Sequence, residues 1–553
     1  MNKILKIAII VDDLFISDYI ADLITWSENI DCIDISNFVY LVNDKEDRLP
    51  KKSRLQKILS MDFWKQYPRR RLKNFIVSLE KKRNLKNNKI HQNSVDKHNL
   101  YNFGLKKIEV HQEPTKSKVS FRATQKSLDL LKKEQFDLFI RFNKKIIRGD
   151  LLTVSNFGIL SMHHGSDLNY RGGPSGFWEV YNSDNKSGYI IQQLTEELDN
   201  GNILFRGFIP TQKSWLLNKS ELNIRSFFYL KKIIFEISKA HELPNFLVNV
   251  PYSKSLNKDP TIFVMIKYLF KKLKNKQDSK KFKNADNRYL VGYQEGEWGS
   301  LNYRNANFIK NPDNKFLADP FIISKNHKNY CFLESYDYFL DKGTIDVYEL
   351  TSGNSEFLGT AIEEEFHLSF PYLLETENEI YLIPESSKNR DIRIYKSIDF
   401  PLKWKLENVI IDDIDASDSI IFHRDNLWWL LTNVDELGLG DHNYQMNIYY
   451  SDNLLSQDWK PHNLNPIILN PSYGRNGGFL KKGDNLYRVA QKYGFNQKYG
   501  EGISIRKIQE ITKNSYVEEE IASYVDFYDD SILGTHHLSS NNIFTVFDIW
   551  KSP

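Results

Sequence analysis

The chain of 553 residues contains only two cysteines, Cys32 and Cys331, and they lie far apart in the sequence. Two distant cysteines cannot form a disulfide framework or a thiolate metal site. So little cysteine is typical of a reducing compartment. We therefore expect a cytoplasmic protein, and we expect no metal.

Long hydrophobic runs are also missing. No stretch approaches the ~20 apolar residues that a membrane-spanning helix needs. The apolar run over residues 3–11 contains Lys6, leads into Asp12 and Asp13, and lacks a small-residue cleavage site, so it does not fit a signal peptide. We expect a soluble protein, or one held at most to the inner face of a membrane.

The chain has little excess charge of either sign. Its 75 Lys and Arg residues against 71 Asp and Glu residues leave a net charge of +4, which excludes a whole-chain binder of polyanions. We expect no nucleic-acid partner. Basic residues gather in residues 47–118, which predict a solvated helical insertion or, alternatively, a site for a phosphate-rich ligand. Residues 259–276 predict a helix, apolar and then basic, that docks on its own domain or makes a weak contact with an anionic membrane.

The first half of the chain alternates strand and helix signals. A buried parallel strand is predicted over 3–11, followed by a helix over 14–26 and a second strand over 31–42. Further elements are predicted beyond the basic insertion: a helix over 123–134, a strand over 136–142, a short helix over 146–152 and a strand over 157–165. This order predicts an α/β domain.

Beyond residue 289 the pattern changes to short aromatic and β-branched runs separated by polar turns. Each repeated unit has an apolar strand, a turn and an aromatic-rich strand. The units are 319–335, 371–386, 418–433, 477–492 and a looser copy at 536–550. Their starts are roughly 50 residues apart, the length of a four-stranded propeller blade. Five copies predict an all-β, five-bladed propeller.

The densest chemistry of the first half lies in residues 158–204. His163 and His164 follow a strand, and Asp199 precedes a turn that contains glycine. A histidine paired with a carboxylate from a neighbouring loop suits acyl transfer to an amine. A histidine pair at a strand end is just as often only hydrogen-bonded structure.

The same segment resembles the N-terminal domain of folate-dependent formyltransferases, over about residues 1–250 and most clearly over 136–210. The matching pieces are Ser-Met-His at 161–163, Tyr-Arg-Gly at 170–172, Trp178 and Leu-Asp-Asn-Gly-Asn-Ile-Leu at 198–204. The resemblance implies a Rossmann-type fold and formyl transfer from 10-formyltetrahydrofolate without a metal.

Site residues follow from that resemblance position by position. His163 takes the catalytic role, Asp199 is its partner carboxylate, and Ser161 stands where the family has an asparagine. Because serine is shorter than asparagine, this departure weakens the expected oxyanion site. The residues implied in substrate or cofactor binding are His164, Arg171, Gly172 and Trp178.

Acidic and basic residues recur at comparable places in the propeller repeats. Inner-strand residues of a propeller converge on its central funnel, where carboxylates can bind or cleave a sugar. The candidate funnel residues are Asp319, Glu334, Glu385, Asp418, Arg475 and Arg488. This half resembles the propeller of family 43 glycoside hydrolases, and more closely the N-terminal propeller of glucosamine inositolphosphorylceramide transferases. By that resemblance Asp319 would be a hydrolase base and Asp418 its modulating partner.

We therefore expect an α/β formyltransferase-like domain over 1–250, a helix and linker over 251–288, and a propeller over 289–553. The predicted function is formyl transfer to a nucleotide- or lipid-linked amino sugar of surface polysaccharide synthesis, with the propeller recognising the glycan. The alternative is a carbohydrate-active or glycan-binding propeller protein, related to hydrolases or glycosyltransferases, whose first half is non-catalytic. A third possibility is a non-catalytic assembly protein at the membrane surface.

Overall fold

The computed structural model describes eleven parts of the chain: 3–42, 61–82, 97–115, 119–165, 170, 172–197, 201–248, 256–283, 288–495, 498–524 and 532–551. The chain divides into two compact units, Met1–Leu273 and Lys274–Pro553. Each unit is described by itself. Among the helices of the described parts, none combines the length and the apolar character needed to cross a membrane.

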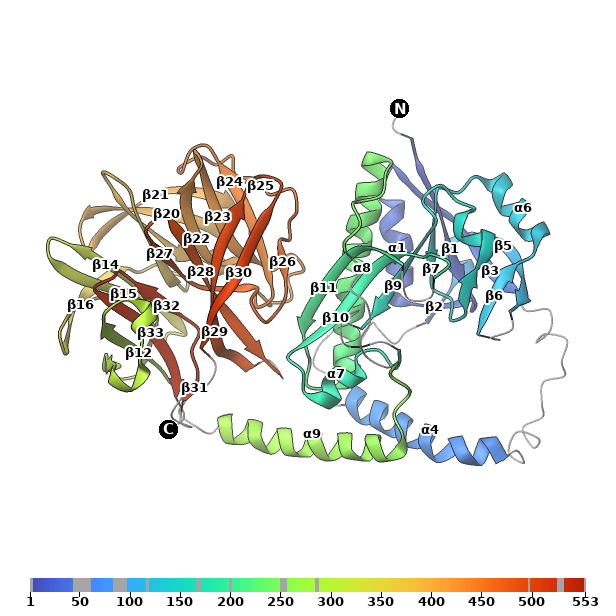
Figure 1. The fold of residues 1–553 in the computed structure, drawn as a ribbon, viewed down its shortest axis with the longest axis horizontal. Helices are drawn as coiled ribbons and strands as arrows, with labels where there is room; N and C mark the ends of the chain where they lie inside the picture. The colour runs from blue at the N-terminus through green and yellow to red at the C-terminus, as the bar shows by residue number, and fades with distance from the viewer. Residues whose placement is uncertain are drawn as a thin grey trace. The chain divides into compact units, whose positions relative to one another are not determined.

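The first unit is built on a nine-stranded mixed sheet in the order β11-β10-β9-β7-β1-β3-β5-β6-β8 (Figure 1). The five central strands are parallel, and β10 and β11 add an antiparallel edge. The strands are β1 (Leu5–Val11), β3 (Ile33–Val42), β5 (Lys106–Pro114), β6 (Ser120–Ala123), β7 (Leu138–Arg141), β8 (Ile146–Arg148), β9 (Ile159–His164), β10 (Lys186–Gln193) and β11 (Asn202–Pro210). A separate pair joins β2 (Phe15–Ser17) to β4 (Lys97–Asn99).

Helices cover this sheet because its central strands are apolar on both faces. Strand β1 reads LKIAIIV, and apart from Lys6 every residue in it is buried. The helices are α1 (Asp18–Glu28), α4 (Met61–Glu80), α6 (Gln125–Glu134), α7 (Phe177–Asn182), α8 (Trp215–Ala240) and α9 (Ile262–Lys283). After β1 the chain adds β3, β5 and β6 on one side of that strand, and it then returns to add β7 on the other side, so the order of the strands reverses between β1 and β7. In open α/β sheets such a switch point is where ligands bind, at the carboxyl ends of the strands.

Two local predictions for this unit are corrected by the structure. The predicted insertion over 47–118 includes β5, which pairs with β3 inside the main sheet. The helix predicted over 146–152 is instead strand β8 followed by a 3-10 helix at Gly149–Thr153. Short β-branched segments carry strand and helix signals at once, so the sheet decides between them.

The helix predicted over 259–276 is part of α9, which docks on its own unit. Met265 and Tyr268 are buried, and the Tyr268 hydroxyl donates a hydrogen bond to Glu80 of α4 at 2.5 Å. Lys272 pairs with the same carboxylate at 2.6 Å. A weak membrane contact by this helix remains an untested prediction.

The second unit consists of five antiparallel sheets, which we call blades (Figure 1). The first blade is β14–β17 (Lys315–Lys325, Lys328–Asp337, Lys342–Thr351, Asn354–Ile362) and the second is β18–β21 (Ser369–Glu375, Ile380–Glu385, Asp391–Asp399, Lys403–Asp412). The third is β22–β26 (Ala416–Arg424, Leu427–Val434, Gln445–Ser451, Lys460–Pro461, Ile468–Leu469), and the fourth is β27–β30 (Arg475–Lys482, Asn485–Gly494, Lys498–Ile511, Tyr516–Tyr524). The closing blade is β12 (Arg288–Glu295), β13 (Asn307–Phe308), β31 (Ile532–Gly534), β32 (Leu538–Ser540) and β33 (Phe544–Lys551).

The blades form a closed ring. Inner strands β14, β18, β22, β27 and β32 each contact the next, and β32 returns to β14. The ring is closed by β12, from the start of the unit, which pairs antiparallel with β33 from its end over eight residue pairs. Because the two ends of the unit share one blade, no blade edge is left open at the junction. The predicted five-bladed propeller is therefore confirmed.

Candidate functional site

The inner strands of the propeller share a local distortion. In the first and third blades the strand register shifts at Asp319 and Asp418, and each of these residues has a φ of 50°. The second blade shifts at Phe370, with a φ of 43°, and the fourth at Gly477 and Gly478. A bulge re-aims the side chain that it carries. Two of the four bulges thus present a carboxylate at the ring of inner strands.

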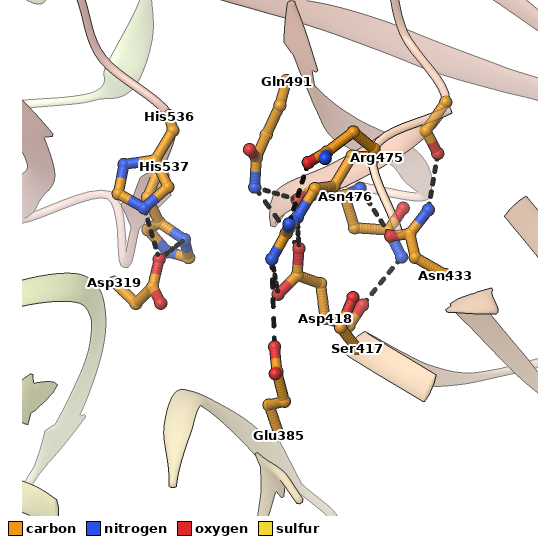
Figure 2. Close-up of polar contacts among 12 residues, drawn as sticks. Asp319, Glu385, Ser417, Asp418, Asn433, Arg475, Asn476, Gln491, His536 and His537 are labelled. Atoms are coloured by element: carbon orange, nitrogen blue, oxygen red, sulfur yellow. Dashed lines mark hydrogen bonds and ion pairs between the residues drawn. The ribbon is translucent and has the colours of Figure 1, made fainter. Parts of the chain in front are cut away.

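The carboxylates and cations that gather there form one group, which we call the axial cluster. Figure 2 shows these side chains in two groups: Asp319 with His536, and Arg475 with Asp418 and Glu385. The cluster comprises Asp319, Glu334, Glu385, Asp418, Arg475 and His536. All are buried or nearly so, which makes their charges costly unless they are paired.

Asp418 and Arg475 are the best-defined pair of the cluster. The Arg475 Nε lies 2.5 Å from Asp418 Oδ2, and its Nη2 lies 3.4 Å from Oδ1 (Figure 2). Gln491 donates to the same Oδ2 at 3.3 Å. Arg475 also approaches Glu385 Oε2 at 3.9 Å and packs over the ring of Tyr499. One guanidinium from the fourth blade therefore serves acidic groups of the third and second blades.

Asp319 is paired with histidines of the closing blade. His536 Nε2 lies 3.2 Å from Asp319 Oδ1, and His536 Nδ1 lies 2.8 Å from Asp548 Oδ1. Asp548 also accepts backbone N–H groups from His536 at 3.0 Å and His537 at 3.1 Å. His536 is thus held between two carboxylates, away from solvent.

These contacts raise the pKa of His536 and lower the pKa of Asp319. Burial alone would lower the pKa of His536, but Asp548 and Asp319 raise it to about 10. His536 and His537 in turn lower the pKa of Asp319 to about 2, against its burial. At neutral pH this is an ionised pair. His537, with little compensation for its burial, has a pKa lowered to about 4 and is neutral.

Two acids of the cluster have the opposite shift. Burial raises the pKa of Glu334 well above its ordinary value, and the nearby charges of Asp319 and Glu385 add to this. Burial also raises the pKa of Asp418 to about 7, although Arg475 opposes the shift. The cluster therefore includes groups that can hold a proton at neutral pH beside groups that are ionised.

A divalent cation would have one candidate position here. Ligand atoms of Asp319, His536 and Asp548 lie within 4.8 Å of one another. A metal requires the neutral imidazole, whereas the two carboxylates keep His536 protonated. Whether the protein binds a metal remains untested.

Not every predicted funnel residue belongs to this cluster. Arg488 is fully buried, but it pairs with Glu518 of the outer strand β30 at 2.6 Å and donates to the Tyr473 carbonyl at 2.8 Å. Arg506 shares the same Glu518. Arg488 therefore stabilises the fourth blade from within.

The residues predicted in the first unit are only partly brought together. Ser161, His163 and His164 of β9 line one cavity of about 680 Å³. His164 accepts or donates a hydrogen bond with Ser226 at 2.8 Å, and burial lowers its pKa to about 3, so it is neutral. Trp178, on α7, does not line the cavity; its indole N–H donates to the Gly173 carbonyl at 3.3 Å.

Gly172 is not among the described residues that line this cavity. Gly172 forms an isolated bridge with Asn257. Asp199 and Arg171 lie outside the residues that the structure describes. The catalytic pair predicted from His163 and Asp199 therefore remains untested.

Sequence reasoning missed His536, His537 and Asp548. They belong to the fifth and loosest repeat, where the first half of the unit is short and the pattern is weakest. The signal was the histidine pair itself, which stands at the start of that repeat as Asp319 and Asp418 stand in theirs.

Fold and site together define a five-bladed propeller with a buried, mixed-charge axial cluster. Residues 304–532 match the family model described as "Glucosamine inositolphosphorylceramide transferase 1, N-terminal". The protein named glucosamine inositolphosphorylceramide transferase 1 is 40% identical over 213 residues in Arabidopsis thaliana and 38% identical over 209 residues in Oryza sativa subsp. japonica. Each match covers 37% of this chain and 27% of the relative, so the chain spans about a quarter of the length of these relatives.

Solved structures with a similar arrangement include glycoside hydrolases. A family 117 glycoside hydrolase of Zobellia galactanivorans has 15% identity and a TM-score of 0.32, over 48% of this chain and 92% of its own. The native arabinanase of Bacillus subtilis has 14% identity and a TM-score of 0.30, over 40% and 90% of the two chains. The propeller assignment itself rests on the strand pairing described above.

These findings correct the predicted function. Formyl transfer to an amino sugar is wrong as the leading interpretation, because the relatives that match carry the name of a glucosamine inositolphosphorylceramide transferase. The family model matches residues within the propeller, and the first unit is shown only as a mixed sheet with helices. The predicted resemblance of the second half to the N-terminal region of those transferases is confirmed. The prediction of 10-formyltetrahydrofolate depended on formyl transfer, and it is untested, as is the cytoplasmic location.

Proposed function

We propose that the propeller recognises the polar headgroup of a glycan or glycolipid and that the protein acts in sugar transfer. The observation that carries this proposal is the match of residues 304–532 to the transferase family, on a propeller whose axis holds a charged cluster. The names of the relatives supply the substrate class: glucosamine and an inositol phosphate attached to a lipid.

The exposure of the cluster indicates which groups meet a ligand. The side chains of Glu385 and Arg475 keep 12% and 16% of their surface exposed, and His367, whose Nε2 lies 3.6 Å from Oε1 of Glu334, keeps 22%. Asp418 and His536 keep only 3% and 4%. The first three are therefore the groups that contact the headgroup, and the more deeply buried Asp418 holds Arg475 in place. A carboxylate and a guanidinium can bind sugar hydroxyls, and the guanidinium also suits a phosphate.

Binding is favoured over glycoside hydrolysis by how the carboxylates are paired. Hydrolysis needs one free base and one acid across the scissile bond. Asp319, the predicted base, is neutralised by His536 at 3.2 Å, and Asp418 is neutralised by Arg475 at 2.5 Å. Asp319 has a pKa lowered to about 2 by its histidine partners, so the predicted base is a weak one, and the cluster suits recognition better than cleavage.

The experiment measures binding of glucosamine and of myo-inositol 1-phosphate to the full chain by isothermal titration calorimetry. Glu385→Gln should lower at least ~10-fold the affinity for the probe that binds, because a hydrogen bond to a charged group is lost. The matched control is Glu379→Gln, in the same blade, whose carboxylate pairs with Lys396 at 2.7 Å on the outside. No binding by the wild type, or an equal loss in both variants, would contradict the proposal.

A further inference from the structure

The cavity of about 680 Å³ in the first unit lies at the switch point of its sheet. Its walls come from the segment that begins α1, from the end of β7, from β9 and from α8. Strands β7 and β9 run parallel to β1, so their carboxyl ends open to the same side. A volume in this range is typical of a small-molecule site.

The described lining of this cavity is positively charged. It contains Arg141 and Lys219, and no Asp or Glu is among the described residues that form it. Arg141 is anchored by neutral acceptors, the Asn143 side chain at 3.2 Å and the Lys145 carbonyl at 3.0 Å. Within the described parts of the chain neither cation has an ion pair with a carboxylate. Such unbalanced charge in a cavity attracts an anion.

Burial lowers the pKa of Arg141, and the charge of Asp12 opposes this shift, although Asp12 is not a lining residue of the cavity. Asp12 accepts the backbone N–H of Lys144 at 3.0 Å, and Asp18 lies 2.5 Å from the His98 ring. Loss of surrounding water lowers the pKa of Lys219, and the charge of Lys73 lowers it further. An anionic ligand would relieve this repulsion between the two lysines.

A second feature of the cavity is a column of aromatic rings. Phe142 stacks on Phe227 with centroids 5.7 Å apart and an interplanar angle of 5°, and Tyr19 stacks on the same Phe227 at 5.5 Å. All three residues line the cavity. Tyr19 is held by the Ser220 hydroxyl at 3.1 Å. Aromatic rings beside the two cations, Arg141 and Lys219, suit a ligand that has both a flat ring and an anionic group.

We propose that this cavity binds a nucleoside diphosphate, with Arg141 and Lys219 on the phosphates and the aromatic column beside the base. α1 begins at the same cavity, with Ser17, Tyr19 and Ile20 in its wall, so the positive end of its dipole adds to the attraction. This site is in the first unit and does not rest on the function proposed for the propeller.

The experiment titrates UDP, ADP, GDP and thymidine diphosphate, together with their nucleosides and pyrophosphate, into the full chain by calorimetry. At least one diphosphate should bind at least ~10-fold more tightly than its nucleoside. Lys219→Ala should weaken that ligand at least ~10-fold, and Arg141→Gln should do the same. Lys219 has no partner among the described side chains, so its variant tests the proposal even if the Arg141 variant fails to fold.

The matched control is Lys213→Ala, an exposed lysine six residues earlier that does not line the cavity. It should leave the affinity within about twofold of the wild type. Absence of binding by every diphosphate would overturn the proposal, as would equal losses in the Lys213 and Lys219 variants. Pyrophosphate that binds as tightly as the best diphosphate would overturn the assignment to a nucleotide.

Discussion

The axial cluster of the propeller and the cavity of the first unit both contain charged side chains. In the cluster these charges are paired with one another, whereas the described lining of the cavity contains cations and no acid. In the cluster, cations form ion pairs with carboxylates of other blades: Arg475 of the fourth blade pairs with Asp418 of the third, and His536 of the closing blade pairs with Asp319 of the first. In the cavity, Arg141 and Lys219 are lining residues, and no Asp or Glu is among the described residues that line it. Charge that is paired inside the fold joins its elements, whereas charge left unpaired is available to a ligand. Three predictions test this difference.

The largest effect is expected from Arg475→Ala. The variant leaves Asp418 buried without its cation, and breaking a buried pair from one side costs about 3–5 kcal/mol. Urea unfolding of the full chain, followed through the propeller transition, measures the loss. Arg390→Ala is the control, because its pair with Asp413 is exposed and worth less than about 1 kcal/mol. Equal losses in both variants would show that the axial pair does not join the blades.

A smaller effect is expected from pH. The pKa of His536 is about 10 in the folded protein and 6.5 ordinarily, so the folded state holds its proton more tightly. The stability contributed by this pairing is full below about pH 6.5 and is lost as the pH rises toward 10. Between pH 7 and pH 10 the free energy of unfolding should fall by about 1 kcal/mol per pH unit.

His536→Gln removes the titrating group and should flatten this slope. Asp319 and Asp548, the carboxylates that face it, are unchanged in the variant. His423→Gln, at an exposed position on β22, serves as the matched histidine control and should keep the wild-type slope. The same slope in all three proteins would assign the pH dependence to other groups.

The smallest effect is expected from Lys219→Ala on the unliganded protein. Its ammonium group has no ion pair to lose among the described residues, so the free energy of unfolding should change by less than about 0.5 kcal/mol. Thermal unfolding of the first unit measures this. A loss as large as that of Arg475→Ala would mean that the cavity charge is structural, and the contrast between the two regions would disappear.

The propeller could be predicted from the sequence because its signal is local and repeated. Each blade begins with an apolar strand, a polar turn and an aromatic strand, and strands of this kind fold against their sequence neighbours. The repeats also placed Asp319 and Asp418 correctly on inner strands. Arg488 looked equivalent by type, yet its side chain turns to Glu518. Successive side chains along a strand point to opposite faces of the sheet, and residue type alone does not show which face a given side chain is on.

The first unit shows where motif reasoning fails. Residues 161–163 and 198–204 fit a formyltransferase pattern, but a histidine at a strand end and a loop with glycine are features that many open α/β sheets share. Arg141, at the end of β7, carried no motif and was not singled out, although it lines the same cavity as Ser161 and His163. The short motif therefore located the cavity, and the catalytic roles that it predicted for His163 and Asp199 stay predictions.

The sequence by itself determined the number of blades, the two-strand repeat that marks each of them and the α/β character of the first unit. These follow from hydrophobic periodicity and turn spacing, which act over a few residues. The tertiary structure alone decided which charges meet. Asp418 pairs with Arg475, which is 57 residues away in the sequence, and Asp319 of the first blade pairs with His536 of the closing blade. The first pair forms because neighbouring inner strands β22 and β27 pack together, and the second forms because the closing blade returns to the first. Electrostatic energy depends on distance in space and burial, not on position in the chain.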